Sequence, residues 1–241
     1  MISEIQELQP TQLQYMDQPP LLTGEAKIIK CDQDDRGTYI VLDRTLFHPQ
    51  GGGQPSDKGT VRIDSVDHPV IHVKIEAQVV YHYLESSIDS LRSLPSLTSV
   101  EMQPIEMRPI EMRIDTEYRS LCSKLHTAGH WVSHVLTVAD PSLKAVKGHH
   151  FPNECYIEAI GSLNPESNLL ERLNALLKDS FEGDIPVVIS KNDGLRTVMM
   201  GNHLPVGCGG THVSSLKEIG PIRVSKVKIK KDRVKISYEL S

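Results

Sequence analysis

Two short histidine-containing segments constrain what this chain can fold into. The first reads HTAGH and spaces His126 and His130 four residues apart, in a stretch whose apolar residues recur mostly at steps of three and four and which we predict to be a helix. Both imidazole rings then project from one helix face, about one turn apart, and can converge on a single ion. The second reads CGGTH and places Cys208 and His212 around a glycine pair, which permits a tight loop that turns both side chains inward.

Together the two segments predict a zinc site. They supply three nitrogens and one sulfur, a set that suits zinc, whereas calcium and magnesium prefer oxygen ligands. We therefore expect one Zn²⁺ per chain, held by His126, His130, Cys208 and His212. Taken singly, each segment has an alternative explanation. The HxxxH spacing arises easily in a chain with 11 histidines, and a cysteine in a turn often packs as a small buried hydrophobe.

The remaining pattern predicts an α+β fold in two domains. Residues 1–115 contain short segments rich in Val, Ile and Tyr, separated by Gly, Pro and Asp, as in a small antiparallel β-barrel. Within them, a Ser-rich stretch at residues 86–100 is expected to be a long loop, and PIEMR occurs twice at residues 104–113, which we interpret as a local duplication. Residues 116–241 alternate helical and strand-like segments and are expected to form an α+β zinc-binding domain.

Composition limits where the chain works and what it binds. Its four cysteines are widely spaced without a CxxC pair, which favours a reducing compartment over a disulfide framework. The longest apolar stretches are far shorter than the ~20 residues that cross a bilayer, and the first residues show no apolar signal core. We therefore expect a cytoplasmic protein with no membrane partner.

An RNA contact would need a local basic patch, because the net charge of −5 gives no general attraction to nucleic acid. The C-terminal segment offers one, since Lys226, Lys228 and Lys230 alternate with Val227 and Ile229. As a strand, this segment would hide its apolar residues and present a basic face to RNA phosphates. A solvated face without a partner is the alternative explanation.

The histidine-containing segments resemble the zinc motifs of tRNA synthetase editing domains. HTAGH and CGGTH look like the alanyl type and its free-standing relatives, the AlaX family, whereas the threonyl type usually has other residues between the cysteine and the histidine. The segment TLFHPQGGGQPSD at residues 45–57 resembles the glycine-rich motif of the barrel that precedes the editing domain in that family. With GHHFP at residues 148–152 and EIG at 218–220, the resemblance covers about residues 22–240. We recognise no ATP-handling or anticodon-reading portion, so we expect the chain to edit and not to charge tRNA.

This resemblance implies a zinc-dependent deacylase that removes serine, and also glycine, from mischarged tRNA(Ala) in trans, without a nucleotide cofactor. Zinc would lower the pKa of a water toward ~7 or polarise the ester carbonyl. Four protein ligands close a tetrahedral zinc, so catalysis needs a loose ligand, a fifth coordination position, or a zinc that mainly positions the RNA 3′ end. Three alternatives stay open: a zinc that only staples the fold, a hydrolase of another aminoacyl ester such as a threonyl-tRNA-type substrate, and a non-catalytic RNA-binding module with structural zinc.

Further residues are expected to contact the substrate or the RNA. The resemblance favours Thr127, between the two histidines, as the group that hydrogen-bonds the serine hydroxyl, while a helical threonine bonding its own backbone is the alternative. Gly51, Gly52, Gly53 and Gln54 are expected to let the backbone approach the site or the RNA closely. No GK[ST] follows them, so they are not a phosphate-binding P-loop.

Overall fold

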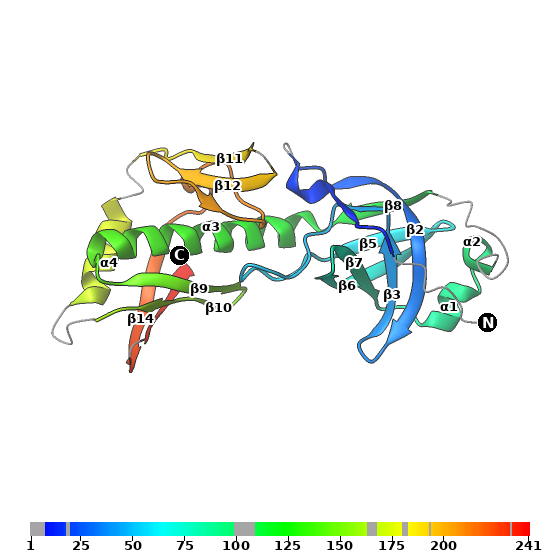
Figure 1. The fold of residues 1–241 in the computed structure, drawn as a ribbon, viewed down its shortest axis with the longest axis horizontal. Helices are drawn as coiled ribbons and strands as arrows, with labels where there is room; N and C mark the ends of the chain where they lie inside the picture. Colours follow the sequence, from blue (N-terminus) through cyan, green and yellow to red (C-terminus); the bar gives the residue numbers. More distant parts are fainter. Residues whose placement is uncertain are drawn as a thin grey trace. The chain divides into compact units, whose positions relative to one another are not determined.

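The structure, a computed structural model, describes residues 8–17, 20–98, 109–162, 168–179, 183–192, 194–231 and 233–241. The chain divides into two compact units (Figure 1). The first consists of Met1–Gln50 and Ser56–Arg119, and the second of Gly51–Pro55 and Ser120–Ser241. The chain therefore leaves the first unit at Gly51, contributes five residues to the second, and returns at Ser56.

A closed antiparallel barrel of six strands forms most of the first unit. In barrel order the strands are β2 (Thr23–Asp34), β3 (Gly37–Leu42), β7 (Val79–Leu84), β6 (Val66–Glu76), β5 (Gly59–Ile63) and β8 (Pro109–Ile114). Alternate side chains of β8 turn inward, because Ile110, Met112 and Ile114 are buried while the residues between them are not. The prediction of an α+β chain with an N-terminal barrel is confirmed.

Short elements complete the first unit, and two of them correct the expected Ser-rich loop. α1 (Ile88–Arg92) begins where the hydroxyl of Ser87 accepts a hydrogen bond from the backbone N–H of Ser90, so a serine that suggests a loop serves here as a helix cap. The other short elements are α2 (Pro95–Thr98), β1 (Gln12–Leu13), η1 (Gln14–Met16) and β4 (Arg44–Thr45), which pairs in parallel with β1. The second PIEMR copy starts β8, and the first lies outside the described residues.

A buried ion pair fixes both ends of the glycine-rich segment within the first unit. The guanidinium of Arg119 binds both carboxylate oxygens of Asp57 and donates to the carbonyl oxygen of Leu46 at 2.7 Å. The backbone N–H of His48 donates to the Asp57 carboxylate, and the N–H of Asp57 donates back to the His48 carbonyl at 3.0 Å. Only 6% of the Arg119 side chain and 1% of that of Asp57 are exposed, so the segment departs and returns at two firmly held points.

The second unit is arranged around α3 (Thr116–Ala139), whose first turn belongs to the first unit. A four-stranded antiparallel sheet has the order β14 (Ile222–Lys230), β15 (Arg233–Leu240), β10 (Glu154–Ile160) and β9 (Lys144–Phe151). A three-stranded sheet has the order β11 (Val187–Asn192), β12 (Leu195–Met200) and β13 (Val206–Gly207), and the remaining helices are α4 (Leu169–Asp179) and η2 (Leu216–Glu218). In Figure 1, α3 runs between β11 and β12 on one side and β9 and β10 on the other.

One apolar core joins these helices and sheets. α4 buries Leu169, Leu173 and Leu177 in it, at the spacing of one helix face. β10 turns Ile157 and Ala159 toward the same core, so the residues that alternate with them lie on the opposite face of the four-stranded sheet. We call this opposite face the outer face of the sheet.

Candidate metal centre

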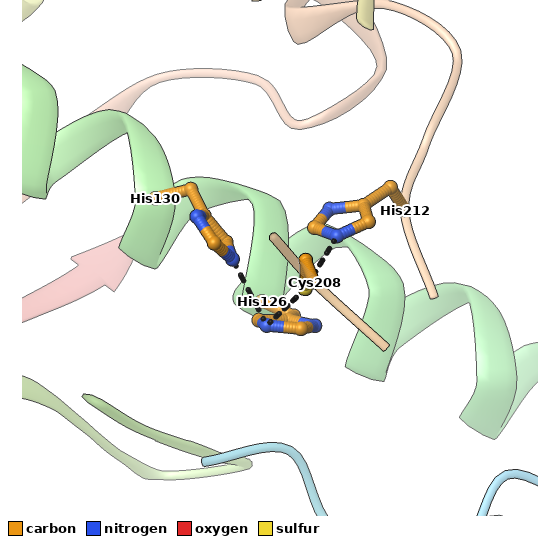
Figure 2. A group of neighbouring side chains, drawn as sticks. All are labelled: His126, His130, Cys208 and His212. Carbon is orange, nitrogen blue, oxygen red and sulfur yellow. Dashed lines mark hydrogen bonds between the residues drawn. The ribbon is translucent and has the colours of Figure 1, made fainter. Parts of the chain in front are cut away.

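Four side chains from two distant segments gather in the second unit (Figure 2). His126 and His130 project from α3, and Cys208 and His212 come from the loop that follows β13. Their ligand atoms all lie within 4.8 Å of one another, and in the described part of the chain no other group of three or more His, Cys, Asp or Glu residues is placed to hold a metal. This set of four side chains, which we call the metal group, could bind a metal ion, as the spacing of the two sequence segments predicts.

Three distances within the group are close to those expected between the ligands of a zinc ion. His126 Nε2 lies 3.2 Å from His130 Nε2 and 3.6 Å from Cys208 Sγ, and His212 Nε2 lies 3.2 Å from the same sulfur. Tetrahedral bonds of about 2.0–2.1 Å to nitrogen and 2.3 Å to sulfur would place such ligand atoms roughly 3.3–3.6 Å apart. Burial lowers the pKa of His130 to about 4, so this imidazole is neutral at physiological pH, as a metal ligand must be.

Gln54 holds the first imidazole in the orientation that a metal needs. Its side chain is fully buried, and its Oε1 accepts from the backbone N–H of Thr211 at 2.9 Å, while its Nε2 donates to Thr211 Oγ1 at 2.8 Å. The same Oε1 lies 2.7 Å from His126 Nδ1. Because this oxygen can only accept, Nδ1 of His126 carries the ring proton and its Nε2 presents a lone pair to the other three ligands.

Glycine is required where the loop meets this imidazole. A Cβ added to Gly210 would lie 2.0 Å from Cε1 of His126 and 2.7 Å from Oε1 of Gln54. At Gly207, in contrast, the nearest atom to an added Cβ is a side-chain carbon of Leu195 at 3.9 Å. The CGGTH segment therefore needs its second inner glycine because of close approach.

Thr127 is buried and uses its hydroxyl within the protein. Oγ1 donates to the carbonyl of Ser123 at 2.7 Å, so its contact with Nδ1 of His212 at 3.1 Å requires that nitrogen to be the donor. The Nε2 of His212 is thereby left to face Cys208. This geometry agrees with the alternative of a helical threonine bonded to its own backbone, and it adds a role in orienting His212. Direct recognition of a substrate hydroxyl would require one of these bonds to break.

The glycine-rich segment enters the same site by its backbone. The carbonyl of Gly53 accepts from the N–H of His150 at 2.8 Å, and a Cβ on Gly53 would lie 2.5 Å from the carbonyl oxygen of Gly148. Gly52 lines a cavity that His130 also lines, whereas the side chain of Gln54 is enclosed. The predicted basic residues Lys226, Lys228 and Lys230 are exposed on β14 and are not part of the metal group.

A cavity of about 670 Å³ adjoins the metal group. His130 is the one ligand among its lining residues, which also include His150, Ser133, His134, Met200 and Asn202. Its volume is within the range of pockets that bind small ligands. A molecule bound in the cavity would therefore meet the metal group at His130.

His150 is a residue of this site to which the sequence pattern assigned no role. Its Nδ1 lies 2.7 Å from the hydroxyl of Tyr238, which donates to the carbonyl of Leu125 at 2.9 Å, so Nδ1 of His150 carries the proton and Nε2 is an acceptor. Burial, with smaller contributions from His130 and His149, lowers the pKa of His150 to about 3. The cavity thus contains a neutral imidazole with a fixed tautomer.

Comparison with known proteins relates the chain to tRNA synthetases and to an alanyl-tRNA editing protein. Residues 11–98 match the family described as tRNA synthetases class II (A). The chain is 29% identical to the alanyl-tRNA editing protein AlaX-L of Pyrococcus horikoshii, over 87% of this chain and 53% of that protein. It is 25% identical to the alanine–tRNA ligases of Caldivirga maquilingensis and Methanopyrus kandleri, over 93% and 91% of this chain and 26% and 25% of those enzymes.

These matches confirm the resemblance drawn from the motifs: the chain is a homologue of an alanyl-tRNA editing protein and of part of the alanine–tRNA ligases. It spans about half the length of the editing protein and about a quarter of the ligases. Among the described residues, no helix is long and apolar enough to cross a membrane.

Proposed function

We propose that this homologue of the alanyl-tRNA editing protein AlaX-L is a zinc-dependent aminoacyl-tRNA deacylase, which acts in trans on mischarged tRNA(Ala) in the cytoplasm. Ser-tRNA(Ala) is its main substrate and Gly-tRNA(Ala) a second one. The observation that carries this proposal is the group of three imidazoles and one thiol beside a cavity of about 670 Å³. The soft, nitrogen-and-sulfur character of the group favours zinc over calcium or magnesium.

His126, His130, Cys208 and His212 would hold the zinc ion. A bound zinc supplies a Lewis acid that polarises the ester carbonyl or activates a water. The chain's own groups prepare the site in two ways. Buried hydrogen bonds fix two of the imidazoles, and a neutral His150 offers Nε2 as a hydrogen-bond acceptor to a water or a substrate in the cavity.

Selectivity for serine over alanine requires a hydrogen bond to the serine hydroxyl, because alanine is the smaller side chain and cannot be excluded by size. Ser133 and Asn202 line the cavity and offer polar atoms for that bond. If Thr127 instead reads the hydroxyl, Thr127→Val will lower the rate on Ser-tRNA(Ala) by roughly tenfold and spare Gly-tRNA(Ala). An equal loss on both substrates would assign Thr127 to the orientation of His212.

The test is hydrolysis of Ser-tRNA(Ala) by the purified chain before chelation, after chelation, and after zinc is restored. We expect activity to be lost and regained while the far-ultraviolet circular dichroism stays unchanged. A fold that collapses with chelation would point to structural zinc, tRNA binding without hydrolysis would point to an RNA-binding module, and hydrolysis of Thr-tRNA alone would point to another aminoacyl ester.

A further inference from the structure

Three rings and a lysine form a continuous stack on the outer face of the four-stranded sheet. The ring of His149 is parallel to that of Phe151, with centroids 4.2 Å apart and an interplanar angle of 5°. His149 also stacks on Tyr156, with centroids 4.9 Å apart and an interplanar angle of 23°. The Nζ of Lys235 lies 3.3 Å from the centroid of the Tyr156 ring, as a cation–π contact. We call this arrangement the aromatic stack.

Strand register places the aromatic stack on one face. Tyr156 of β10 lies opposite His149 of β9, and the next outward residue, Glu158, lies opposite Lys235 of β15. His150, between the two ring-bearing residues of β9, is buried on the inner face. Phe151, His149 and Tyr156 are only half-buried, so the stack is open to solvent.

Cations extend from the aromatic stack across the rest of the sheet. In the pairing of β14 with β15, Lys226 lies opposite Ser237, Lys228 opposite Lys235, and Lys230 opposite Arg233. By the same alternation, the outer face carries the following eight basic residues: Lys144, Lys147, Arg223, Lys226, Lys228, Lys230, Arg233 and Lys235.

Carboxylates on this face are fewer and already engaged. Glu158 accepts from Arg233 at 3.1 Å, and Glu239 pairs with Arg223. The third, Glu154, lies 3.9 Å from Lys235 and 3.8 Å from His149. A positive face on a chain of net charge −5 indicates an anionic partner.

The combination of flat rings and cations selects one class of partner. Nucleic-acid single strands are bound by aromatic faces on which bases stack, beside positive charges that follow the phosphates. Lys235 covers one end of the aromatic stack, whereas among the described residues no second ring covers Phe151 beyond His149. A base can therefore continue the stack at its Phe151 end.

We propose that the outer face of this sheet binds a single-stranded RNA segment, with a base stacked on Phe151 at one end of the face and the backbone following the lysines of β9, β15 and β14 across the sheet. This inference rests on the proposed function, since the unpaired 3′ end of the tRNA substrate is the strand it would hold. Lys147 belongs to both surfaces, because it lies opposite Glu158 in the sheet and also lines the cavity beside the metal group.

The test is binding of a fluorescent single-stranded RNA oligonucleotide to the full chain and to Phe151→Leu, which keeps an apolar side chain and removes the flat face. We expect Phe151→Leu to bind this RNA about tenfold more weakly than the wild type. In a second variant, Lys228→Glu, the slope of log Kd against log salt concentration should be shallower by about 0.7. Tyr81→Leu is the matched control, because it also removes a half-buried ring near a lysine, in this case Lys74 of the barrel at 5.3 Å. It should bind RNA as the wild type does.

Wild-type affinity of Phe151→Leu would overturn the proposal, and so would an equal loss on duplex RNA or tighter binding to anionic vesicles than to RNA. Kinetics separate it from the proposed function. Phe151→Leu should raise the KM for Ser-tRNA(Ala) and leave kcat and zinc content unchanged. If the wild-type chain binds RNA but hydrolyses no substrate, only the deacylase proposal is refuted. If Phe151→Leu hydrolyses Ser-tRNA(Ala) with an unchanged KM, only the proposal of an RNA-binding face is refuted.

Discussion

Replacing Gln54 by alanine should weaken zinc binding although Gln54 does not touch the metal. The variant loses three contacts at once: 2.7 Å to His126 Nδ1, 2.9 Å from the N–H of Thr211, and 2.8 Å to Thr211 Oγ1. His126 is then free to rotate or to carry its proton on Nε2, and the backbone beside His212 loses its anchor at Thr211. Removing the partner that orients a metal-bound histidine typically costs 10- to 100-fold in affinity, or about 1.4–2.7 kcal/mol.

Competition with a chromogenic chelator measures the zinc Kd directly, without reference to activity. Gln50→Ala is the matched control, because Gln50 is exposed and lies just before the same loop, and it should retain the wild-type Kd. Gln54→Glu should recover most of the affinity, since a carboxylate still accepts from His126 Nδ1 and from Thr211. An unchanged Kd in Gln54→Ala would refute the idea that this side chain fixes the imidazole.

Three further variants test other parts of the structure. Gly210→Ala should purify with little zinc, because its Cβ would overlap His126, whereas Gly207→Ala should bind zinc normally; metal analysis of both is decisive, and normal zinc in Gly210→Ala would contradict the close approach. Asp57→Asn should lower the free energy of unfolding, measured in urea, by about 3 kcal/mol or more, because it leaves the buried guanidinium of Arg119 uncompensated. Asp67→Asn removes an exposed pair with Arg62 and should cost at most about 1 kcal/mol, so equal losses would contradict a special role of the buried pair. Burial lowers the pKa of His82 from 6.5 to about 4, so below pH 6.5 the unfolded chain binds a proton at this residue while the folded chain does not. Between pH 7 and pH 5, the free energy of unfolding of the wild type should therefore fall by about 2 kcal/mol more than that of His82→Gln. Parallel pH profiles of the two proteins would show that His82 is not the group responsible.

The metal group was predictable because its signals are local. Helical periodicity fixes the faces of His126 and His130, and two glycines mark the loop that carries Cys208 and His212. The barrel was equally predictable, because short Val- and Ile-rich segments separated by turn residues form strands that can assemble into few other architectures. The division at residues 115 and 116 stays a prediction.

What escaped the sequence depends on long-range contacts. Gln54 is 72 residues from His126, and nothing in its neighbourhood indicates a buried amide that serves an imidazole. The aromatic stack requires the register of β9 against β10, which places His149 opposite Tyr156. The Ser-rich loop was misread because Ser87 caps a helix as readily as it occupies a turn.

Because Gly51–Pro55 belongs to the second unit, that unit, which holds the candidate metal ligands, is discontinuous in the sequence. A fragment that starts at residue 116 would carry all four ligands but lack Gln54, the acceptor that fixes the tautomer of His126. Shortening the loop by a residue would pull against the two ends held by Asp57 and Arg119. The two units are thus not interchangeable modules, and an exchange between relatives would have to transplant the loop together with the helix that it serves.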